Sequence, residues 1–304
     1  PIAYLQRQYP YQDGVIIPNI NGNLLIDSTV TLTKLEALAS GKTIVGNGSN
    51  VAVADYIKNA KVEEVTGNIV GMISPHAGYM YSGQVAAYGY KGVSKFKYNT
   101  VIIFAPSHRV YIDGASIMDK GAYRTPLGTV EIDEEIAEKI LKKGDIVKNN
   151  IEPHRYEHSL EVQLPFLQVV LKDFKLIPIV IGGEIELCEP ISSIVYEAIK
   201  DSKKSFLIVG STDLSHYYPY KKAVALDGIA VKHLNAFDIK GAIDDYKKGS
   251  FEACGIAPMI TTMYLSRMLG ASNAKVLKYA NSGDVTGDKS GVVGYVSAIF
   301  FKAI

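Results

Sequence analysis

The sequence predicts an α/β protein in which a central, mostly parallel or mixed sheet is covered by helices on both faces. Short apolar runs alternate with longer segments of helical periodicity, a rhythm typical of βαβ units. The short runs are apolar throughout, which is expected of strands buried on both faces. The chain has 304 residues, of which 47% are hydrophobic and 21% are charged, so it can bury a sizeable core.

Six of the short runs are expected to be strands. The first stops at Pro75 and the second at Pro106, where proline removes a donor from the ladder of backbone hydrogen bonds. The later runs are equally short and rich in residues that favour strands. The expected strands are Ile69–Ser74, Thr100–Ala105, Lys175–Ile181, Lys204–Gly210, Val276–Ala280 and Val292–Phe301.

Six segments between or beside these runs repeat apolar residues at helical spacing. In the third of them, Ser159 is a suitable N-cap before the periodicity that begins at Leu160. The expected helices are Gly83–Tyr90, Ile132–Lys142, Ser159–Leu171, Leu187–Ile199, Val224–Leu234 and Ile256–Leu269. We therefore expect residues 1–304 to form a single domain with its core over residues 68–301.

The first 66 residues differ from the rest because Gly and Asn interrupt them repeatedly. One helical pattern lies near Leu32–Ala39. Two interpretations stay open for this segment, a divergent edge layer of the main domain or a small appendage.

Composition and charge exclude several classes of function. The net charge is +1, with 32 basic and 31 acidic residues well mixed, so neither nucleic acid nor an anionic membrane is an expected partner. No apolar run approaches the roughly 20 residues that span a bilayer. The segment Ser40–Thr43 lacks the glycine that begins a P-loop, so no nucleotide is expected. Cys188 and Cys254 lie far apart and outside any CxxC, which favours a reducing, cytoplasmic setting without disulfides.

Three of the apolar runs are each followed by a histidine. His76 follows the first, His108 the second, and His216 the fourth, where Asp213 precedes it on the same loop. In open α/β sheets, ligands bind beyond the carboxyl ends of the strands. Imidazole is the commonest protein ligand for Zn, Cu and Fe. The pattern therefore predicts a metal or acid–base site at one edge of the sheet, provided that these strands are near neighbours.

The segment "HRYEH" formally matches the H-x-x-E-H pattern of a class of zinc peptidases, through His154, Glu157 and His158. The pattern works only within a helix, where positions four apart share a face. Pro153 lies just upstream and the helical periodicity begins only at Leu160. We therefore interpret the segment as a loop and not as a peptidase motif.

The two cysteines are interpreted differently. Cys254 lies just before a helical pattern, and a cysteine at a helix N-terminus can have a lowered pKa and act as a soft metal ligand or a nucleophile. The alternative, a small buried apolar side chain, is also common. Cys188 has acidic neighbours that disfavour a thiolate, so we interpret it as structural.

Five segments, in this order along the chain, resemble the Memo family: "SPHAGYMYSG", "APSH", "EHSLEVQLPF", "STDLSH" and "ACG". The resemblance extends from about Asn68 to Phe301 and rests on several motifs, so it is specific. The Memo family is structurally similar to class III extradiol dioxygenases, the non-haem iron enzymes that open catechol-type rings. The resemblance thus implies a fold like the B subunit of those dioxygenases.

The resemblance also implies roles for particular residues. Those that match the family's metal site are His76, His108 and Cys254. Asp213 and His216 match its "SxDxxH" segment and are acid–base candidates, while His158 matches the "EHS" histidine and is expected to line the same site. We group Asp213, His158 and His216 as catalytic candidates, with His216 as the residue that transfers protons.

Two hypotheses for function follow. The first is a metal-dependent, dioxygenase-like oxidoreductase that uses one divalent or redox ion, iron or copper rather than zinc, on a small molecule. True extradiol dioxygenases bind iron through two histidines and a carboxylate, and Cys254 in the third place puts ring opening in question. The second is a metal-binding scaffold without turnover that captures a peptide or partner protein. A homo-oligomer is compatible with either hypothesis.

Overall fold

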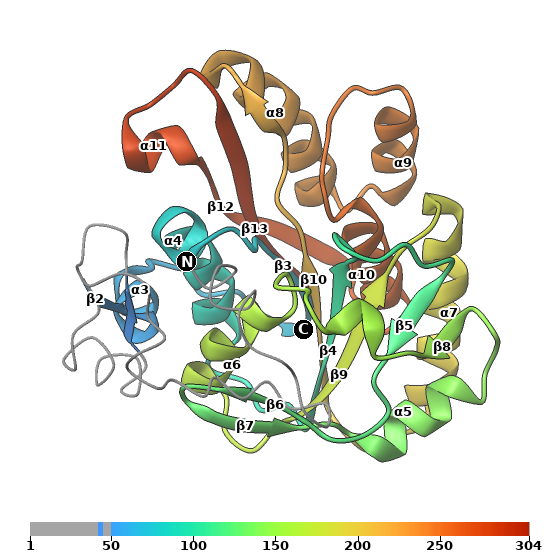
Figure 1. The fold of residues 1–304 in the computed structure, drawn as a ribbon. Coiled ribbons are helices and arrows are strands. Elements are labelled where there is room, and N and C mark those ends of the chain that lie inside the picture. The colour runs from blue at the N-terminus through green and yellow to red at the C-terminus, as the bar shows by residue number, and fades with distance from the viewer. Residues whose placement is uncertain (1–41, 45–49, 304) are drawn as a thin grey trace.

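A computed structural model describes residues 42–44 and 50–303 of the chain, and a nine-stranded sheet runs through it (Figure 1). The order across the sheet is β11–β13–β3–β10–β4–β9–β5–β8, and β12 also pairs with β13. The strands span Asn68–Ser74 (β3), Thr100–Pro106 (β4), Ala115–Ile117 (β5), Val147–Asn149 (β8), Lys175–Ile181 (β9), Phe206–Ser211 (β10), His216–Tyr218 (β11), Asn273–Asn281 (β12) and Val292–Lys302 (β13). The predicted helical pattern near Leu32–Ala39 lies outside the described residues.

The middle of the sheet is parallel and its flanks are mixed. Strands β3, β10, β4 and β9 are adjacent and parallel, whereas β13 pairs antiparallel with β3, and β5 pairs antiparallel with β9. Every residue of β4 is buried, as expected of a continuously apolar strand covered on both faces. The predicted α/β architecture with a mixed central sheet is confirmed.

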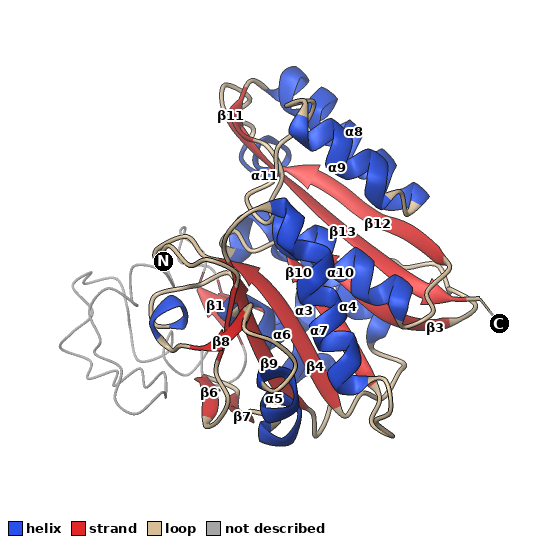
Figure 2. Ribbon diagram, turned by 90° about the vertical axis from the view of Figure 1, so that its right-hand side faces the viewer, coloured by secondary structure: helices blue, strands red, loops and turns tan. Residues whose placement is uncertain are grey.

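Helices cover both faces (Figure 2). Side chains of adjacent strand residues point to opposite faces. A Cβ on Gly71 would meet Ser266 of α10, whereas the next residue, Met72, would be met by a Cβ on Gly89 of α4. Helix α6 packs beside α4, α7 packs beside α10, and α8 covers β12 and β13. The bounds are Tyr79–Val93 (α4), Glu134–Leu141 (α5), Leu164–Val170 (α6), Cys188–Ile199 (α7), Tyr220–Ala236 (α8) and Ile256–Met268 (α10).

One predicted helix begins later than expected. The sequence predicted a helix over Ser159–Leu171, but α6 begins at Leu164, after a 3₁₀ turn over Glu161–Gln163. The backbone N–H of Ser159 donates to the side chain of Glu157 instead of starting a helix, and Pro165 suits the first turn of the helix that follows. The residues before the helix are thereby kept in an irregular conformation beside the sheet edge.

The sequence did not predict several short elements of the described chain. Most of them are too short to show a clear period, and only α9 is longer than one or two turns. The same described residues contain no helix with both the length and the apolar character needed to cross a bilayer. The additional elements are β1 Lys42–Ile44, β2 Asn50–Ala52, α3 Val53–Asn59, β6 Ala122–Thr125, β7 Gly128–Glu131, α9 Ile239–Lys247 and α11 Ser282–Thr286, besides β5, β8 and β11.

The order of the strands brings three of the expected loops together. The chain leaves β3 toward His76, β4 toward His108, and β10 toward Asp213, and β10 lies between the other two strands. Because the three strands are parallel, their carboxyl ends meet at the same edge of the sheet. The sequence predicted a site here only if these strands were near neighbours, and in the structure they are.

Candidate metal centre

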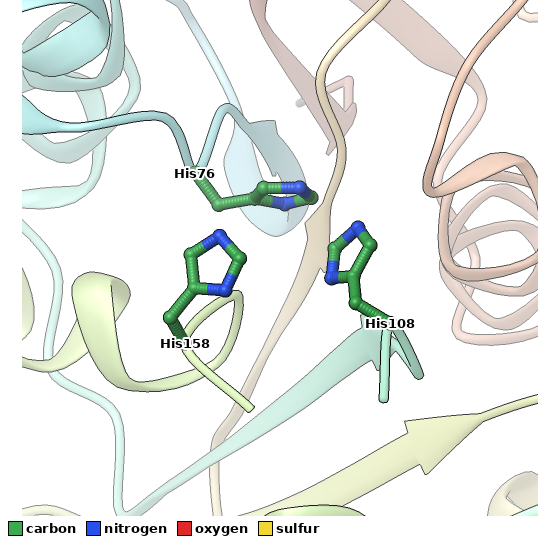
Figure 3. Close-up of side chains that lie close together, drawn as sticks. All are labelled: His76, His108 and His158. Carbon is green, nitrogen blue, oxygen red and sulfur yellow. The ribbon is translucent and has the colours of Figure 1, made fainter. Parts of the chain in front are cut away.

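Three histidines from separate segments meet at the carboxyl edge of the sheet. His76 lies two residues beyond the end of β3, His108 lies two residues beyond the end of β4, and His158 comes from the irregular segment before α6. One ring nitrogen from each lies within 4.8 Å of the other two. Figure 3 shows the rings of His108 and His158 on either side of a common space that His76 closes.

The three rings form a nearly regular triangle. The ring centroids of His76 and His108 are 5.2 Å apart, those of His76 and His158 are 5.6 Å apart, and those of His108 and His158 are 5.3 Å apart. The side chain of His76 is buried, at 3% exposure, whereas those of His108 and His158 are 29% and 27% exposed. The cluster is therefore closed to solvent on the side of His76, and solvent reaches it on the side of His108 and His158.

One carboxylate holds two of the histidines. Glu157 Oε1 lies 2.9 Å from His108 Nδ1 and 3.4 Å from His158 Nδ1, and Glu157 Oε2 accepts a hydrogen bond from the backbone N–H of His108 at 2.7 Å. Burial works to raise the pKa of Glu157, but the hydrogen bonds from His108 and Ser159 outweigh it and lower the pKa to about 2. An ionised carboxylate only accepts, so the Nδ1 atom of His108 carries a proton, and in a neutral ring the lone pair is then on Nε2.

His76 is anchored on the sheet side. Its Nδ1 lies 2.8 Å from the hydroxyl of Ser211, the last residue of β10, and its backbone N–H donates to Asp213 Oδ1 at 2.8 Å. Burial, followed by the neighbouring His108 and His158, lowers the pKa of His76 well below its usual value. Burial also lowers the pKa of His158. Neutral imidazoles at neutral pH are the form that binds a metal ion.

Cys254 adjoins this cluster through His76. Its Sγ lies 3.2 Å from His76 Nε2 and 3.3 Å from the backbone nitrogen of Asp213, which donates to it. The next residue, Gly255, lets α10 approach the end of β10, because a Cβ there would lie 2.2 Å from the carbonyl oxygen of Ser211. The three histidines form the mutually close group, and Cys254 stands beside it.

The pKa of Cys254 is raised and not lowered. A position before a helix can lower the pKa of a thiol, which was one of the two interpretations that the sequence left open, but burial, followed by the negative charge of Asp213, raises it to about 12. Desolvation of a thiolate thus outweighs the partial positive charge of the helix N-terminus. The thiol is protonated at neutral pH, and a coordinated metal ion would have to displace that proton.

Asp213 and His216 lie on the same loop but turn to different partners. Asp213 turns toward His76, with its Oδ2 4.0 Å from His76 Nε2, whereas His216 Nδ1 donates to the carbonyl oxygen of Leu214 at 2.7 Å. The loop is tight enough that His216 finds its partner two residues back, so the carboxylate remains available to His76. Burial raises the pKa of Asp213 to about 7 and lowers the pKa of His216.

The "HRYEH" segment lies on a 3₁₀ turn and a loop, as expected, and not within one helix. His154 Nδ1 lies 3.0 Å from Tyr123 Oη, and His154 Nε2 lies 3.2 Å from the carbonyl oxygen of Ser116. Burial lowers the pKa of His154 to about 4. His154 is therefore a neutral structural residue that fastens this segment to β5 and β6, and of the three residues only Glu157 and His158 reach the histidine cluster.

The clustered histidines could be named from the sequence, but the residues that hold them could not. Glu157 was noticed as part of a polar segment, yet its contact with His108, 49 residues away, was not predicted. Ser211 and Gln163, which contact each other and lie next to His76, were not singled out. The one signal in the sequence was the run of polar residues just before the periodicity that begins at Leu160, and in the structure Glu157, Ser159 and Gln163 of this stretch are buried and bind neighbouring groups.

The arrangement is suited to a metal ion of intermediate softness. Three neutral imidazoles are a ligand set for Zn, Cu or Fe and leave a coordination position open. Nitrogens bound to one ion at about 2.0–2.1 Å lie roughly 3.4 Å apart in tetrahedral geometry, so rotations that close the observed span by at most about 1.4 Å bring all three into contact with one ion. The residues therefore fit a bound metal.

Comparison with known proteins agrees with the motifs. A family model described as "Memo-like protein" matches residues 49–299. A "MEMO1 family protein" of Sulfolobus acidocaldarius is 40% identical over 75% of this chain and 81% of its own length. Another from Methanobrevibacter smithii is 36% identical over 79% of this chain and 86% of its own length. Among solved structures, an uncharacterized protein of Escherichia coli K12 has a TM-score of 0.47 and 10% identity, covering 76% of this chain and 99% of its own.

Proposed function

This chain belongs to the Memo family, and from that membership and its histidine cluster we propose that it is a metal-dependent protein that performs redox or oxygen chemistry on a small molecule. His76, His108 and His158 would hold one ion, with Cys254 as a further ligand on the side of His76. Such an ion, when bound, would supply redox capacity and polarise a substrate or O2.

A single observation supports the proposal most strongly, namely the direction of the imidazole lone pairs. The Nδ1 atoms of His108 and His158 face Glu157, and that of His76 faces Ser211, so none of these contacts uses an Nε2 atom. In Figure 3 the Nε2 atoms of His108 and His158 point toward the ring of His76, whose own Nε2 lies 3.2 Å from Cys254 Sγ. Rings held in this way lose little freedom when an ion binds. Three unrelated structural histidines would have no reason to share such an orientation.

Two residues beside the cluster are suited to proton transfer. Asp213 has a pKa of about 7, raised by burial, so its carboxyl group can take up or release a proton near neutral pH. His216 keeps its Nε2 unprotonated because Nδ1 donates to Leu214, so it can accept a proton from a group that approaches from solvent. We assign proton transfer to these two residues, with Asp213 the nearer to His76.

The proposal is tested by metal content followed by turnover. The protein is purified without oxygen, its metal content is measured, and O2 uptake is recorded with a panel of catechols and related small molecules. Iron or copper with substrate-dependent uptake supports the proposal. A protein that binds no transition metal, or that binds one and shows no uptake with any compound, contradicts the redox proposal, and the second outcome favours a metal-binding scaffold that captures a peptide or partner protein.

A further inference from the structure

A chain of buried hydrogen bonds lies behind His76. His76 Nδ1 is 2.8 Å from Ser211 Oγ, which is 2.7 Å from the carbonyl oxygen of Ser159 and 3.0 Å from Gln163 Nε2. Gln163 Oε1 in turn lies 2.6 Å from the hydroxyl of Tyr90. Each of these residues is at most 2% exposed. Because water cannot replace a partner there, each donor in the chain must face an acceptor.

The direction of each bond follows from the groups that can only accept. Gln163 Nε2 lies 3.1 Å from the carbonyl oxygen of Pro75 and 3.4 Å from that of Ser159. A flipped amide would place Gln163 Oε1 against those two carbonyl oxygens, so the amide nitrogen must face them. Gln163 Oε1 is then the acceptor for Tyr90, and Gln163 Nε2 is a donor to Ser211.

The same reasoning assigns the proton on His76. The only proton of the Ser211 hydroxyl is directed to the carbonyl oxygen of Ser159, which cannot donate. One hydroxyl lone pair accepts from Gln163 and the other is left for His76. If His76 Nδ1 were unprotonated, two lone pairs would face each other at 2.8 Å. His76 Nδ1 is therefore the protonated nitrogen.

We propose that Ser211, oriented by Gln163, is the positioning residue that holds His76 as the Nδ1–H tautomer and so keeps its Nε2 lone pair open. The competing acceptors are on the other side of the ring, where Cys254 Sγ lies 3.2 Å and Asp213 Oδ2 lies 4.0 Å from Nε2. Without the Ser211 hydroxyl, the proton moves to Nε2 and blocks that lone pair. The effect on metal binding rests on the proposed function, whereas the tautomer does not.

The tautomer is measured directly in the metal-free wild-type protein. Long-range ¹H–¹⁵N NMR spectra distinguish protonated from unprotonated ring nitrogens, and the chain has only six histidines, so His76→Gln identifies the signals of His76. At a pH where His76 is neutral, we expect Nδ1 to be protonated and Nε2 to be unprotonated. The opposite tautomer in the wild-type protein would overturn the inference, whatever the metal content.

Substitution then tests the cause. In Ser211→Ala we expect the proton of His76 to move to Nε2 and the affinity for Zn²⁺, used as the probe, to fall by about 10–100-fold. The matched control is Ser297→Ala, because Ser297 lies in the same sheet, is fully buried, and its hydroxyl contacts no hydrogen-bond partner. We expect the control to keep the wild-type tautomer and Zn²⁺ affinity.

A third variant covers the case in which Ser211→Ala does not fold. Ser211→Cys keeps the volume of the side chain but offers only a weak acceptor, and it is expected to shift the tautomer in the same direction to a smaller extent. An unchanged His76 tautomer in the folded Ser211 variants would overturn the inference. If the wild-type protein binds neither Zn²⁺ nor any other transition metal, the proposed function fails, and the tautomer still decides the role of Ser211.

Discussion

Glu157 binds His108 through both carboxylate oxygens. Oε1 lies 2.9 Å from the ring Nδ1, and Oε2 accepts from the backbone N–H at 2.7 Å. The Glu157 side chain is 1% exposed, so these contacts replace all the water that the carboxylate would otherwise bind. Since Oε1 also faces His158, a single buried anion orients two rings of the cluster.

The first prediction concerns this carboxylate. In Glu157→Gln, one of the two oxygens becomes an amide nitrogen, which can only donate. Placed at Oε1 it faces the Nδ1–H groups of both rings, and placed at Oε2 it faces the backbone N–H of His108, so in either orientation donor faces donor and the rings lose their fixed orientation. Supporting residues of this kind typically contribute about 10–100-fold to metal affinity. We expect a loss of that size in Zn²⁺ affinity, measured by competition with a chromogenic chelator.

Glu152→Gln is the matched control for that measurement. Glu152 lies five residues earlier in the same segment, but its side chain is 59% exposed and pairs with Arg155 at the surface. Exposed pairs of this kind contribute little to stability. Equal loss of affinity in both variants would show that the effect comes from the segment as a whole and not from the buried carboxylate.

The second prediction separates Cys254 as a ligand from Cys254 as a neighbour. If its Sγ joins the three imidazoles on one ion, Cys254→Ser removes the softest ligand and weakens binding of Cu(I) far more than binding of a harder ion. The fold is expected to remain, because serine preserves the size of the side chain. Bound copper and zinc are measured by competition titration, and unchanged affinity for both ions would remove Cys254 from the metal site.

Alkylation provides an independent test of the same thiol. With a pKa of about 12, Cys254 is a thiolate in about one molecule in 10⁴ at pH 8, so in the metal-free protein it should react with iodoacetamide about 10³-fold more slowly than a free cysteine. Cys188 is fully buried, and burial raises its pKa to about 11, so Cys254→Ser gives the background rate. Rapid modification of Cys254 would contradict the raised pKa.

The third prediction distinguishes His158 from His216. His158 belongs to the cluster whose nitrogens lie within 4.8 Å of one another, whereas His216 is fastened to its own loop through Leu214. We expect His158→Ala to lose more metal affinity than the supporting variants lose, and His216→Gln to keep its metal, because the glutamine amide can still donate to that carbonyl. Loss of metal from His216→Gln would make His216 a ligand instead of a proton carrier.

The sequence was sufficient for the strands that build the site because their burial leaves a local signature. β9 has the predicted bounds of Lys175–Ile181, and β4 extends the predicted strand by one residue. Loop histidines at such strand ends could also be named in advance. The contacts that orient them could not, because His108 and Glu157 are 49 residues apart and meet only through tertiary packing.

Short elements that show no hydrophobic periodicity could not be predicted from the sequence either. Strand β11 has three residues, and it is defined by pairing with β13 rather than by its own composition. The hydrogen-bond partners of Asp213 and His216 depend on how the loop between β10 and β11 is folded. From the sequence they were neighbours on one loop, and in the fold they turn to different partners.

The last prediction concerns pH and His154, which lies outside the histidine cluster. Burial lowers its pKa in the folded protein to about 4, against about 6.5 in an unfolded chain. Between these values the unfolded chain binds more protons than the folded protein, so the contribution of His154 to stability is complete above about pH 6.5. It is lost as the pH falls toward 4, and by linkage it amounts to about 3 kcal/mol of the free energy of unfolding.

His154→Gln isolates this contribution, because glutamine can still donate to the carbonyl oxygen of Ser116 and accept from Tyr123 but does not titrate between pH 4 and 7. We expect urea denaturation to show a smaller decline in stability from pH 7 to pH 4 for the variant than for the wild-type protein, even if the variant is less stable at pH 7. The buried His76 adds a decline of the same sign in both proteins, so only the difference between them reports on His154. Parallel pH profiles would mean that His154 is protonated in the folded protein.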